Sequence, residues 1–195
     1  MKNIKSSWII IGVLALLVIY SVSVYNRLVL LEENVSSQWA NVENVYQRRA
    51  DLIPNLVNTV KGYAAHERET LEAVIEARSK ATGINLNADE LTPENLQQFQ
   101  AAQSSFSSAL SRLMVVVERY PDLKANQNFL ELQAQLEGTE NRISVERMKF
   151  NDMVKSFNTK IRRFPANVLK SIFGFEAKAY FEAEEGSEKA PEVQF

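Results

Sequence analysis

Residues 129–164 read FLELQAQLEGTENRISVERMKFNDMVKSFNTKIRRF, and this stretch decides the fold. Large apolar residues recur in it every seven positions, with Leu132 and Met153 between them: Phe129, Leu136, Ile143, Phe150, Phe157 and Phe164. A seven-residue repeat places these side chains in one stripe along a helix, and the stripe needs partner helices to cover it. Pro165 predicts the end of this helix. We therefore expect a long helix in an elongated, coiled-coil-like, antiparallel four-helix bundle.

A second heptad pattern follows Thr92, which is a good N-cap, and Pro93, which suits the first position of a helix. Its apolar members are Leu96, Phe99, Phe106, Leu110, Leu113, Val117 and Tyr120. Gln103 interrupts this seam, and Pro121 predicts where the helix stops.

Two more helices are predicted earlier in the chain. Residues 26–49 carry an apolar stripe with Trp39 beside it: Leu28, Leu31, Val35, Val42 and Val45. Residues 51–82 carry another: Ile53, Leu56, Val60, Tyr63, Val74 and Ala77. Both have the three- and four-residue steps of an amphipathic helix. Residues 84–91 are predicted to form a surface loop.

Composition agrees with an all-α protein. The chain has 195 residues, 46% hydrophobic and 24% charged, with Gly 6 and Pro 5, which is enough for one folded unit and little for tight hairpins. A formal net charge of −2 gives no broad basic field, so the sequence excludes nucleic acid as a partner. With Cys 0, disulfides and thiol chemistry are excluded.

The run from Trp8 to Tyr25 is uncharged and rich in Ile, Leu and Val. As a helix it spans about 27 Å, close to the thickness of a bilayer core. Trp8 and Tyr25 lie at its two ends, where amphipathic rings prefer the headgroup layer. We expect a membrane anchor over residues 8–25, after a short flank at 1–7, continuing into the first amphipathic helix.

The charges around this run predict its orientation. Lys2 and Lys5 outweigh Arg27, so the positive-inside rule places the N-terminus in the cytoplasm and the bundle outside it. The alternative is a cleaved signal peptide, because Ser21 and Ser23 are small residues at a spacing that a signal peptidase accepts. The apolar run is longer than a usual signal core, which favours the retained anchor.

Residues 48–57, RRADLIPNLV, place charge and a proline inside an otherwise amphipathic pattern. Asp51 is a good N-cap, and Pro54 lies within the turn after it, where backbone amides lack helical partners. The sequence therefore predicts that a helix ends near Arg49 and a new one starts at Asp51, or that one helix kinks there. Arg48 and Asn55 complete the segment as candidate assembly residues.

This segment, its continuation KGYAAHE at 61–67, and YNRLV at 25–29 resemble the LemA family of bacterial membrane-anchored helical proteins. The resemblance runs from about Tyr25 to Phe181. It implies a membrane-associated helical protein linked to envelope organisation or membrane shaping, with one relative tied to magnetosome membranes. It carries over no catalytic residues.

Two charged residues fall on apolar seams. Arg49 shares the heptad position of Leu28 and Val42, and Glu67 follows the seam of Val60. Both side chains are expected to point inward, and a buried Arg–Glu pair can fix which helices meet. We therefore expect Arg49 and Glu67 to be partners across the first two helices.

Two metal motifs are incomplete. His66-Glu67 lacks the second histidine of a zinc protease helix, because Thr70 stands at that position. The loop with Asn85, Asn87 and Asp89 begins like a calcium loop, but Glu90 replaces its glycine and Leu96 its bidentate glutamate. No nucleotide loop or nucleophile elbow occurs either, so no catalytic, cofactor or metal site is expected.

The C-terminal part after Pro165 is aromatic beyond the need of a linker. Residues 166–174 with Phe175, Tyr180 and Phe181 are expected to fold back and close one end of the bundle, in preference to forming an exposed docking element. Residues 26–181 would thus be the bundle, and residues 182–195 a flexible acidic tail.

These features favour a non-enzymatic scaffold that is anchored in the bacterial inner membrane and assembles with itself, because anchoring in two dimensions raises effective concentration. The bilayer and further copies of the chain are the expected partners. The alternative is an adaptor that regulates a membrane enzyme such as a protease. A scaffold should form large homo-oligomers alone, whereas an adaptor should stay small until its partner is supplied.

Overall fold

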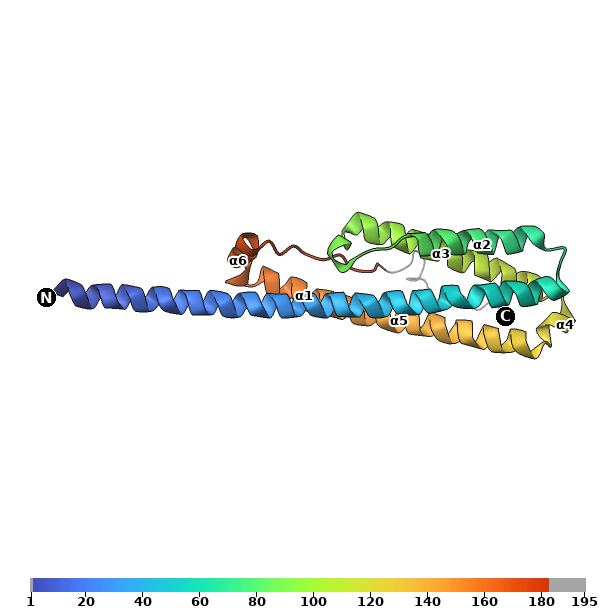
Figure 1. The fold of residues 1–195 in the computed structure, drawn as a ribbon, viewed down its shortest axis with the longest axis horizontal. Coiled ribbons are helices and arrows are strands. Elements are labelled where there is room, and N and C mark those ends of the chain that lie inside the picture. The colour runs from blue at the N-terminus through green and yellow to red at the C-terminus, as the bar shows by residue number, and fades with distance from the viewer. Residues whose placement is uncertain (1, 183–195) are drawn as a thin grey trace, which may run out of the picture.

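The computed structural model describes residues 2–182, and no strand occurs within that range. Six α-helices follow one another, with the 3₁₀ turn η1 (Ala88–Glu90) between the second and third: α1 (Lys2–Tyr63), α2 (Arg68–Gly83), α3 (Pro93–Val117), α4 (Pro121–Lys124), α5 (Gln127–Arg162) and α6 (Ala166–Phe173). The predicted all-α fold is confirmed (Figure 1).

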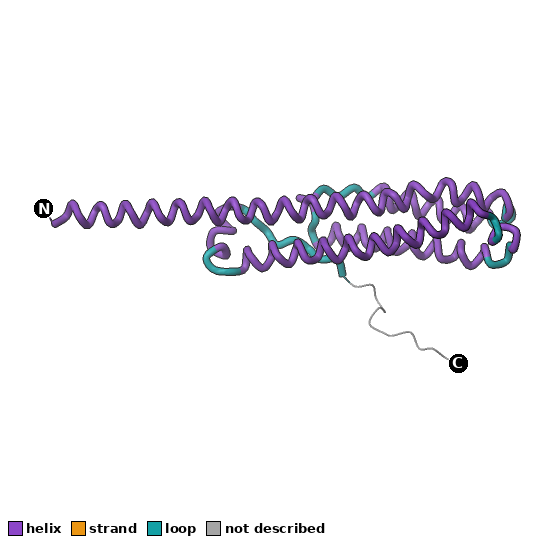
Figure 2. The backbone as a smooth tube through the Cα atoms, turned by 90° about the horizontal axis from the view of Figure 1, so that it is seen from below, coloured by secondary structure: helices purple, strands orange, loops and turns teal. Residues whose placement is uncertain are grey.

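The molecule is a rod built around α1. Helix α5 runs antiparallel along α1, and the α2–α3 hairpin packs beside the C-terminal part of α1 (Figure 1). The N-terminal part of α1 projects alone beyond the bundle, and the short α6 lies across the end of the bundle from which it projects (Figure 2). The four long helices confirm the elongated four-helix bundle with its N-terminal apolar helix.

Of the two alternatives predicted at Asp51, a new helix is wrong and a single helix is confirmed, because α1 continues through Pro54 to Tyr63. Proline lacks the amide that would bond the carbonyl four residues earlier. Here the carbonyl of Ala50 accepts a hydrogen bond from Nε of Arg78 on α2 instead, at 2.7 Å. The orphaned acceptor is thereby satisfied, and Pro54 itself is exposed. The chain turns at residues 64–67, outside the expected joint.

Other helix ends agree with the sequence to within a few residues. The hydroxyl of Thr92 caps α3 by accepting from the amide of Asn95 at 3.2 Å, as expected. Helix α3 ends at Val117, and Pro121 begins α4 instead of marking the stop. Phe164 was expected on the apolar seam, but α5 ends at Arg162 and the Phe164 side chain is 82% exposed.

The buried apolar residues form two clusters along the rod. The span-proximal core lies at the end near the projecting part of α1: Val24, Leu28, Val35, Trp39, Val42, Tyr46, Leu86, Leu91, Leu96, Phe99, Ile143, Phe150, Val154, Phe157, Ile161, Ala166, Phe175 and Phe181. The distal core lies at the other end: Ile53, Leu56, Val57, Val60, Ala64, Leu71, Val74, Ala81, Phe106, Ala109, Leu113, Val117, Leu123 and Phe129.

The loop before α3 is partly buried, which corrects its prediction as a surface loop. Leu86 and Leu91 belong to the span-proximal core. The indole Nε1 of Trp39 donates to the carbonyl of Leu86 at 2.8 Å. The loop is drawn inward because Trp39, which is fully buried, needs an acceptor for its N–H.

The C-terminal segment folds back, as expected, and residues 174–182 form a strap along the bundle (Figure 1). Two amides on α5 hold its backbone. Asn158 donates to the carbonyl of Lys178 at 2.9 Å and accepts from its amide at 3.0 Å. Asn151 makes the same pair of bonds with Phe181, at 3.0 and 2.9 Å. Residues 183–195 of the expected tail lie outside the described residues.

Candidate functional site

Between the two apolar cores lies Arg49, which is 2% exposed. Its Nη1 donates to Oε2 of Glu140 on α5 at 2.8 Å and to the hydroxyl of Ser107 on α3 at 2.9 Å. Its Nη2 donates to Oε1 of Gln103 on α3 at 2.7 Å. We call Arg49, Arg78, Gln103, Ser107 and Glu140 the polar layer. The inward position predicted for Arg49 is confirmed.

The Arg49 guanidinium also stacks between aromatic rings. Its central carbon lies 5.2 Å from the ring centre of Tyr46 and 5.0 Å from that of Phe106. Its Nε is buried and has no hydrogen-bond partner among the described residues. Burying a charge costs several kcal/mol before its partners are counted. The Glu140 side chain is 54% exposed, so water reaches the ion pair from one side and limits that cost.

The polar layer joins all four long helices. Gln103 uses its amide nitrogen to donate to the carbonyl of Ala81, at the end of α2, at 3.3 Å. Arg78 on α2 donates to the carbonyl of Ala50 on α1, as described above. Because the network bridges all four helices, we expect it to favour one register in which the α1–α5 and α2–α3 pairs meet.

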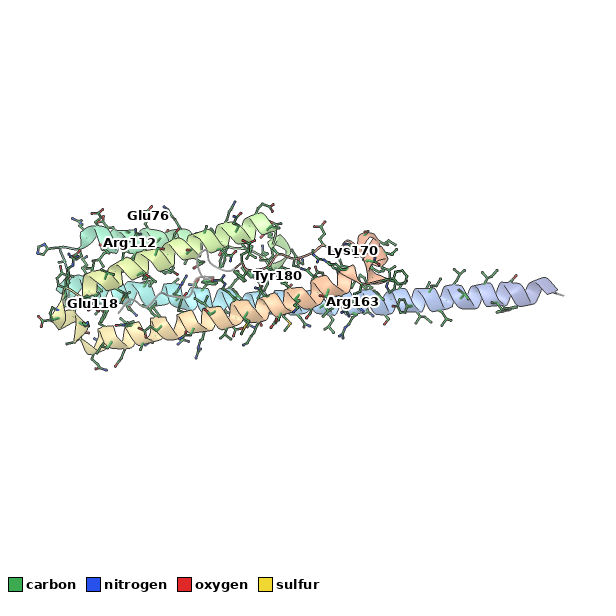
Figure 3. The ribbon with its side chains drawn as sticks, turned by 180° about the vertical axis from the view of Figure 1, so that it is seen from behind. Glu76, Arg112, Glu118, Arg163, Lys170 and Tyr180 are labelled. Carbon is green, nitrogen blue, oxygen red and sulfur yellow. The ribbon has the colours of Figure 1, made fainter. Side chains whose placement is uncertain are left out.

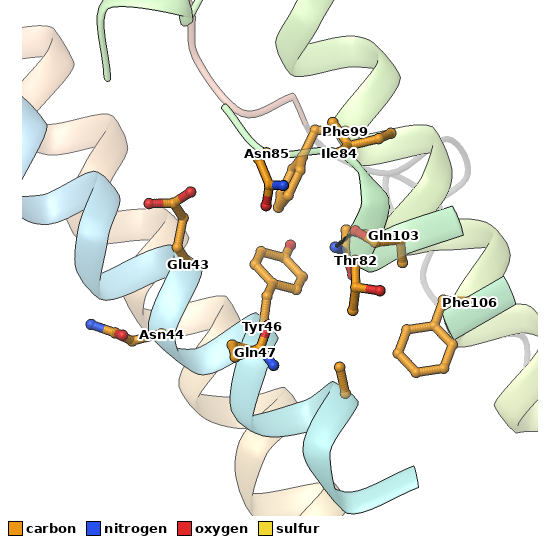
Figure 4. Close-up of a pocket in the computed structure, with 12 residues that line it drawn as sticks. Glu43, Asn44, Tyr46, Gln47, Thr82, Ile84, Asn85, Phe99, Gln103 and Phe106 are labelled. Carbon is orange, nitrogen blue, oxygen red and sulfur yellow. Dashed lines mark hydrogen bonds between the residues drawn. The ribbon is translucent and has the colours of Figure 1, made fainter. Parts of the chain in front are cut away.

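A hollow of about 250 Å³ opens beside the polar layer (Figure 4). Tyr46 and Gln103 line it, with Glu43 at one side and Thr82 at another. Burial raises the pKa of the Glu43 carboxyl, and the nearby indole N–H of Trp39 opposes that shift. The hollow is smaller than a usual small-molecule site of roughly 300–1,000 Å³, whereas another hollow, lined by Arg49 and Glu140, measures about 450 Å³.

The expected pairing of Arg49 with Glu67 is wrong. Because α1 does not break at Asp51, the two residues lie about 20 Å apart along the rod. Glu67 ties the distal turn to the end of α3 instead. Its Oε1 accepts from Nη2 of Arg119 at 3.1 Å and from the hydroxyl of Tyr120 at 3.0 Å. The carboxylate that accepts this bond raises the pKa of Tyr120.

The other residues singled out from the sequence lie on the surface. Arg48, Asp51, Pro54 and Asn55 are exposed on α1, and Oδ1 of Asp51 accepts from Gln47 at 2.7 Å instead of capping a helix. His66 is exposed in the turn at residues 64–67. Trp8 is exposed as well, and Tyr25 contacts Phe173 of α6 with ring centres 5.0 Å apart.

Sequence reasoning missed most of the polar layer. The interruption of the α3 seam at Gln103 was a usable signal, because a buried amide needs polar partners. No sequence pattern marks Ser107, Arg78 or Glu140, because none of them lies on an apolar seam. Among residues 2–182, no group of three or more His, Cys, Asp or Glu side chains is placed to hold a metal ion.

A family model described as the LemA family matches residues 38–195. Among curated relatives, the magnetosome protein MamQ of Magnetospirillum gryphiswaldense is 30% identical over 177 residues, covering 80% of this chain and 64% of that protein. The magnetosome protein MamQ 2 of Paramagnetospirillum magneticum is 27% identical, covering 81% and 64%. Protein LemA of Metamycoplasma hominis is 27% identical over 183 residues, covering 93% and 80%. The chain thus spans just under two thirds of the length of the MamQ proteins.

Proposed function

Because this chain belongs to the LemA family, we propose that it is a membrane-anchored helical scaffold without enzymatic activity, which self-assembles at the bacterial envelope and organises or shapes the membrane. The observation that carries the proposal is the unbroken course of α1 from an apolar segment into the bundle. The similarity to magnetosome proteins favours a structural role at a membrane over a metabolic one.

Helix α1 joins two environments. Its apolar stretch from Ser7 is long and apolar enough to cross a membrane, and almost none of it is buried within the protein. Val24, near the end of the apolar run, and Leu28, just after it, are already in the span-proximal core. A helix shared by span and bundle holds the bundle at a fixed distance from the bilayer. It also favours a retained anchor over a cleaved signal, because cleavage near Ser23 would cut α1 beside a core residue.

The proposed setting is the inner membrane, crossed once, with the bundle outside the cytoplasm. Lys2 and Lys5 outweigh Arg27, and the positive-inside rule sets this orientation. The native chain has Cys 0, so a His66→Cys variant in the exposed distal turn gives a unique label site. We expect a membrane-impermeant maleimide to label this cysteine once the layers outside the inner membrane have been made permeable. Labelling only after the inner membrane is broken would show the opposite orientation, with the bundle in the cytoplasm.

Electron microscopy of the full-length chain tests self-assembly, first in detergent and then in liposomes. We expect rings, arrays or deformed vesicles in the bilayer, because confinement raises the effective concentration of the bundles. Empty liposomes taken through the same steps are the control. Small, dispersed particles on undisturbed vesicles would overturn the scaffold and favour an adaptor for a membrane enzyme such as a protease.

A further inference from the structure

We propose that α6, the end of α5 and the turn between them form a second contact with the bilayer, in which Phe164, Val168 and Ile172 enter the acyl boundary and nearby cations bind anionic phospholipid headgroups. This inference rests on the proposed membrane anchoring of α1 and does not depend on self-assembly.

Helix α6 sits at the depth where the apolar run of α1 ends. The ring of Phe173 packs edge-on against Tyr25, the last residue of that run, at 5.0 Å. Phe173 also lines an apolar groove together with residues of the run itself: Leu14, Leu17, Val18, Ser21, Val22 and Tyr25. If the run spans the bilayer core, α6 lies at the interface, on whichever side the bundle stands.

The side of α6 turned away from the bundle is apolar. Ala166, Leu169 and Phe173 pack against the span-proximal core. On the other side, Phe164 is 82% exposed, Val168 56% and Ile172 73%. Val168 and Ile172 are four residues apart and so share one face of α6, and Phe164 lies in the turn just before that helix. An apolar surface of this kind next to a membrane span is covered when it enters the acyl boundary.

Cations border the apolar surface. Arg162 and Arg163 end α5, and Lys170 is on α6; Figure 3 labels Arg163 and Lys170 at the end of the bundle next to the span. A groove beside α5 adds Arg27, Lys155 and Lys160, with Asp152 as its one acidic lining residue. Within residues 2–182 none of these six cations is in an ion pair.

This combination points to lipid as the occupant, in preference to a second copy of the chain. An interfacial helix presents an apolar face to the acyl chains and Lys or Arg to the headgroups, and both features occur here within one short segment. Two copies that met through the same surface would bring Arg162, Arg163 and Lys170 close to the same cations of the partner.

The first test uses the full chain with Ile172→Cys, labelled with an environment-sensitive NBD dye, in liposomes of phosphatidylcholine and phosphatidylglycerol. Val115→Cys on α3, also exposed, is the matched control. We expect a blue-shifted emission at residue 172 and strong quenching by doxyl-labelled lipids, with neither effect at residue 115. Equal, water-like emission at both sites would overturn the inference. So would an Ile172→Cys chain that oxidises to a disulfide dimer without lipid quenching, which would assign the surface to a second copy.

The second test addresses the headgroups. In pure phosphatidylcholine the quenching at residue 172 should fall several-fold, and adding phosphatidylglycerol should restore it. The triple variant Arg162→Gln, Arg163→Gln, Lys170→Gln should lose this response, whereas a control triple variant at Lys80, Arg112 and Lys124 should keep it. Equal quenching of the parent protein with and without phosphatidylglycerol would overturn the proposed binding to anionic headgroups.

Flotation with the liposomes separates this inference from the proposed function. Floating reports the α1 span, and quenching at residue 172 reports α6. A chain that floats with an unquenched label would overturn the α6 contact and leave the anchor standing. A chain that does not float at all would overturn both, because α6 depends on the span to reach the bilayer.

Discussion

The two halves of the bundle solve the same packing problem with different means. In the distal half, four helices enclose a core that is mostly aliphatic. In the span-proximal half, α2 has ended at Gly83, and its place is taken by the loop before α3 and by the strap at 174–182. The core there is richer in aromatic residues, with Trp39 in ring contact with Phe99, Phe150 and Phe181. Large rings bury more area per residue, which suits contacts with non-helical segments.

The difference also concerns backbone hydrogen bonds. A helix satisfies its own amides and carbonyls, whereas an extended strap needs partners from elsewhere. Asn151 and Asn158, two turns apart on α5, supply them to Phe181 and Lys178. In the distal half the four helices satisfy most of their own backbone groups. We therefore expect the span-proximal half to depend on a few side chains and the distal half to distribute its stability.

The largest effect is expected for Trp39→Ala. It removes a fully buried ring and its hydrogen bond to Leu86, so the free energy of unfolding should fall by about 3–5 kcal/mol. Hydrogen exchange should accelerate at the strap amides of Lys178 and Phe181. The control, Leu113→Ala in the distal core, should cost about 2–5 kcal/mol and leave both amides protected. Protection of the strap in Trp39→Ala would contradict the dependence on single rings.

The next largest loss in the free energy of unfolding is expected for variants of the polar layer between the two halves. Arg49→Met leaves the Gln103 carbonyl oxygen without its donor, and Gln103→Leu leaves Nη2 of Arg49 unpaired. Each should cost about 1–3 kcal/mol, because an unsatisfied buried group carries its full desolvation penalty. The double variant should cost less than the sum, since an apolar layer can replace a buried polar one. Strictly additive costs in chemical denaturation would show that the two residues act independently.

The sequence predicts the distal half of the bundle better than the span-proximal half. Heptad spacing predicted the long helices and most of the distal core, because periodicity reports a helix face directly. The strap has no apolar period of its own, and the sequence does not indicate that Asn151 and Asn158 on α5 bind its backbone. The polar layer could be predicted only in part. Arg49 and Gln103 interrupt apolar seams, whereas Glu140 and Arg78 belong to ordinary solvated faces. Pro54 misled the prediction, because the donor that rescues Ala50 lies 28 residues farther along the chain.

Arg78→Met should have a smaller effect, which depends on Pro54. Loss of the Arg78 donor leaves the Ala50 carbonyl unsatisfied and should cost about 1–2 kcal/mol. In a Pro54→Ala background, the new amide at residue 54 can bond that carbonyl, so Arg78→Met should cost distinctly less. Arg68→Met at an exposed position of the same helix should stay within about 0.5 kcal/mol in both backgrounds. Equal costs for Arg78→Met in both backgrounds would contradict this explanation of the unbroken α1.

The smallest effects come from two carboxyl groups in the span-proximal half, and they have opposite signs. Burial raises the pKa of Glu43 in the folded chain, so its contribution to stability is present at low pH and lost as pH rises through that pKa. Hydrogen bonds from Lys149 and then Gln38 lower the pKa of Glu146, so its contribution is present at neutral pH and lost on acidification. Glu43→Gln should therefore stabilise the protein at pH 7, whereas Glu146→Gln should destabilise it. Both differences from the parent should shrink as the pH falls below the ordinary carboxyl range, and denaturation curves at pH 7 and at acid pH would check this. Destabilisation by both variants at pH 7 would mean that burial does not govern the environment of Glu43 beside the polar layer.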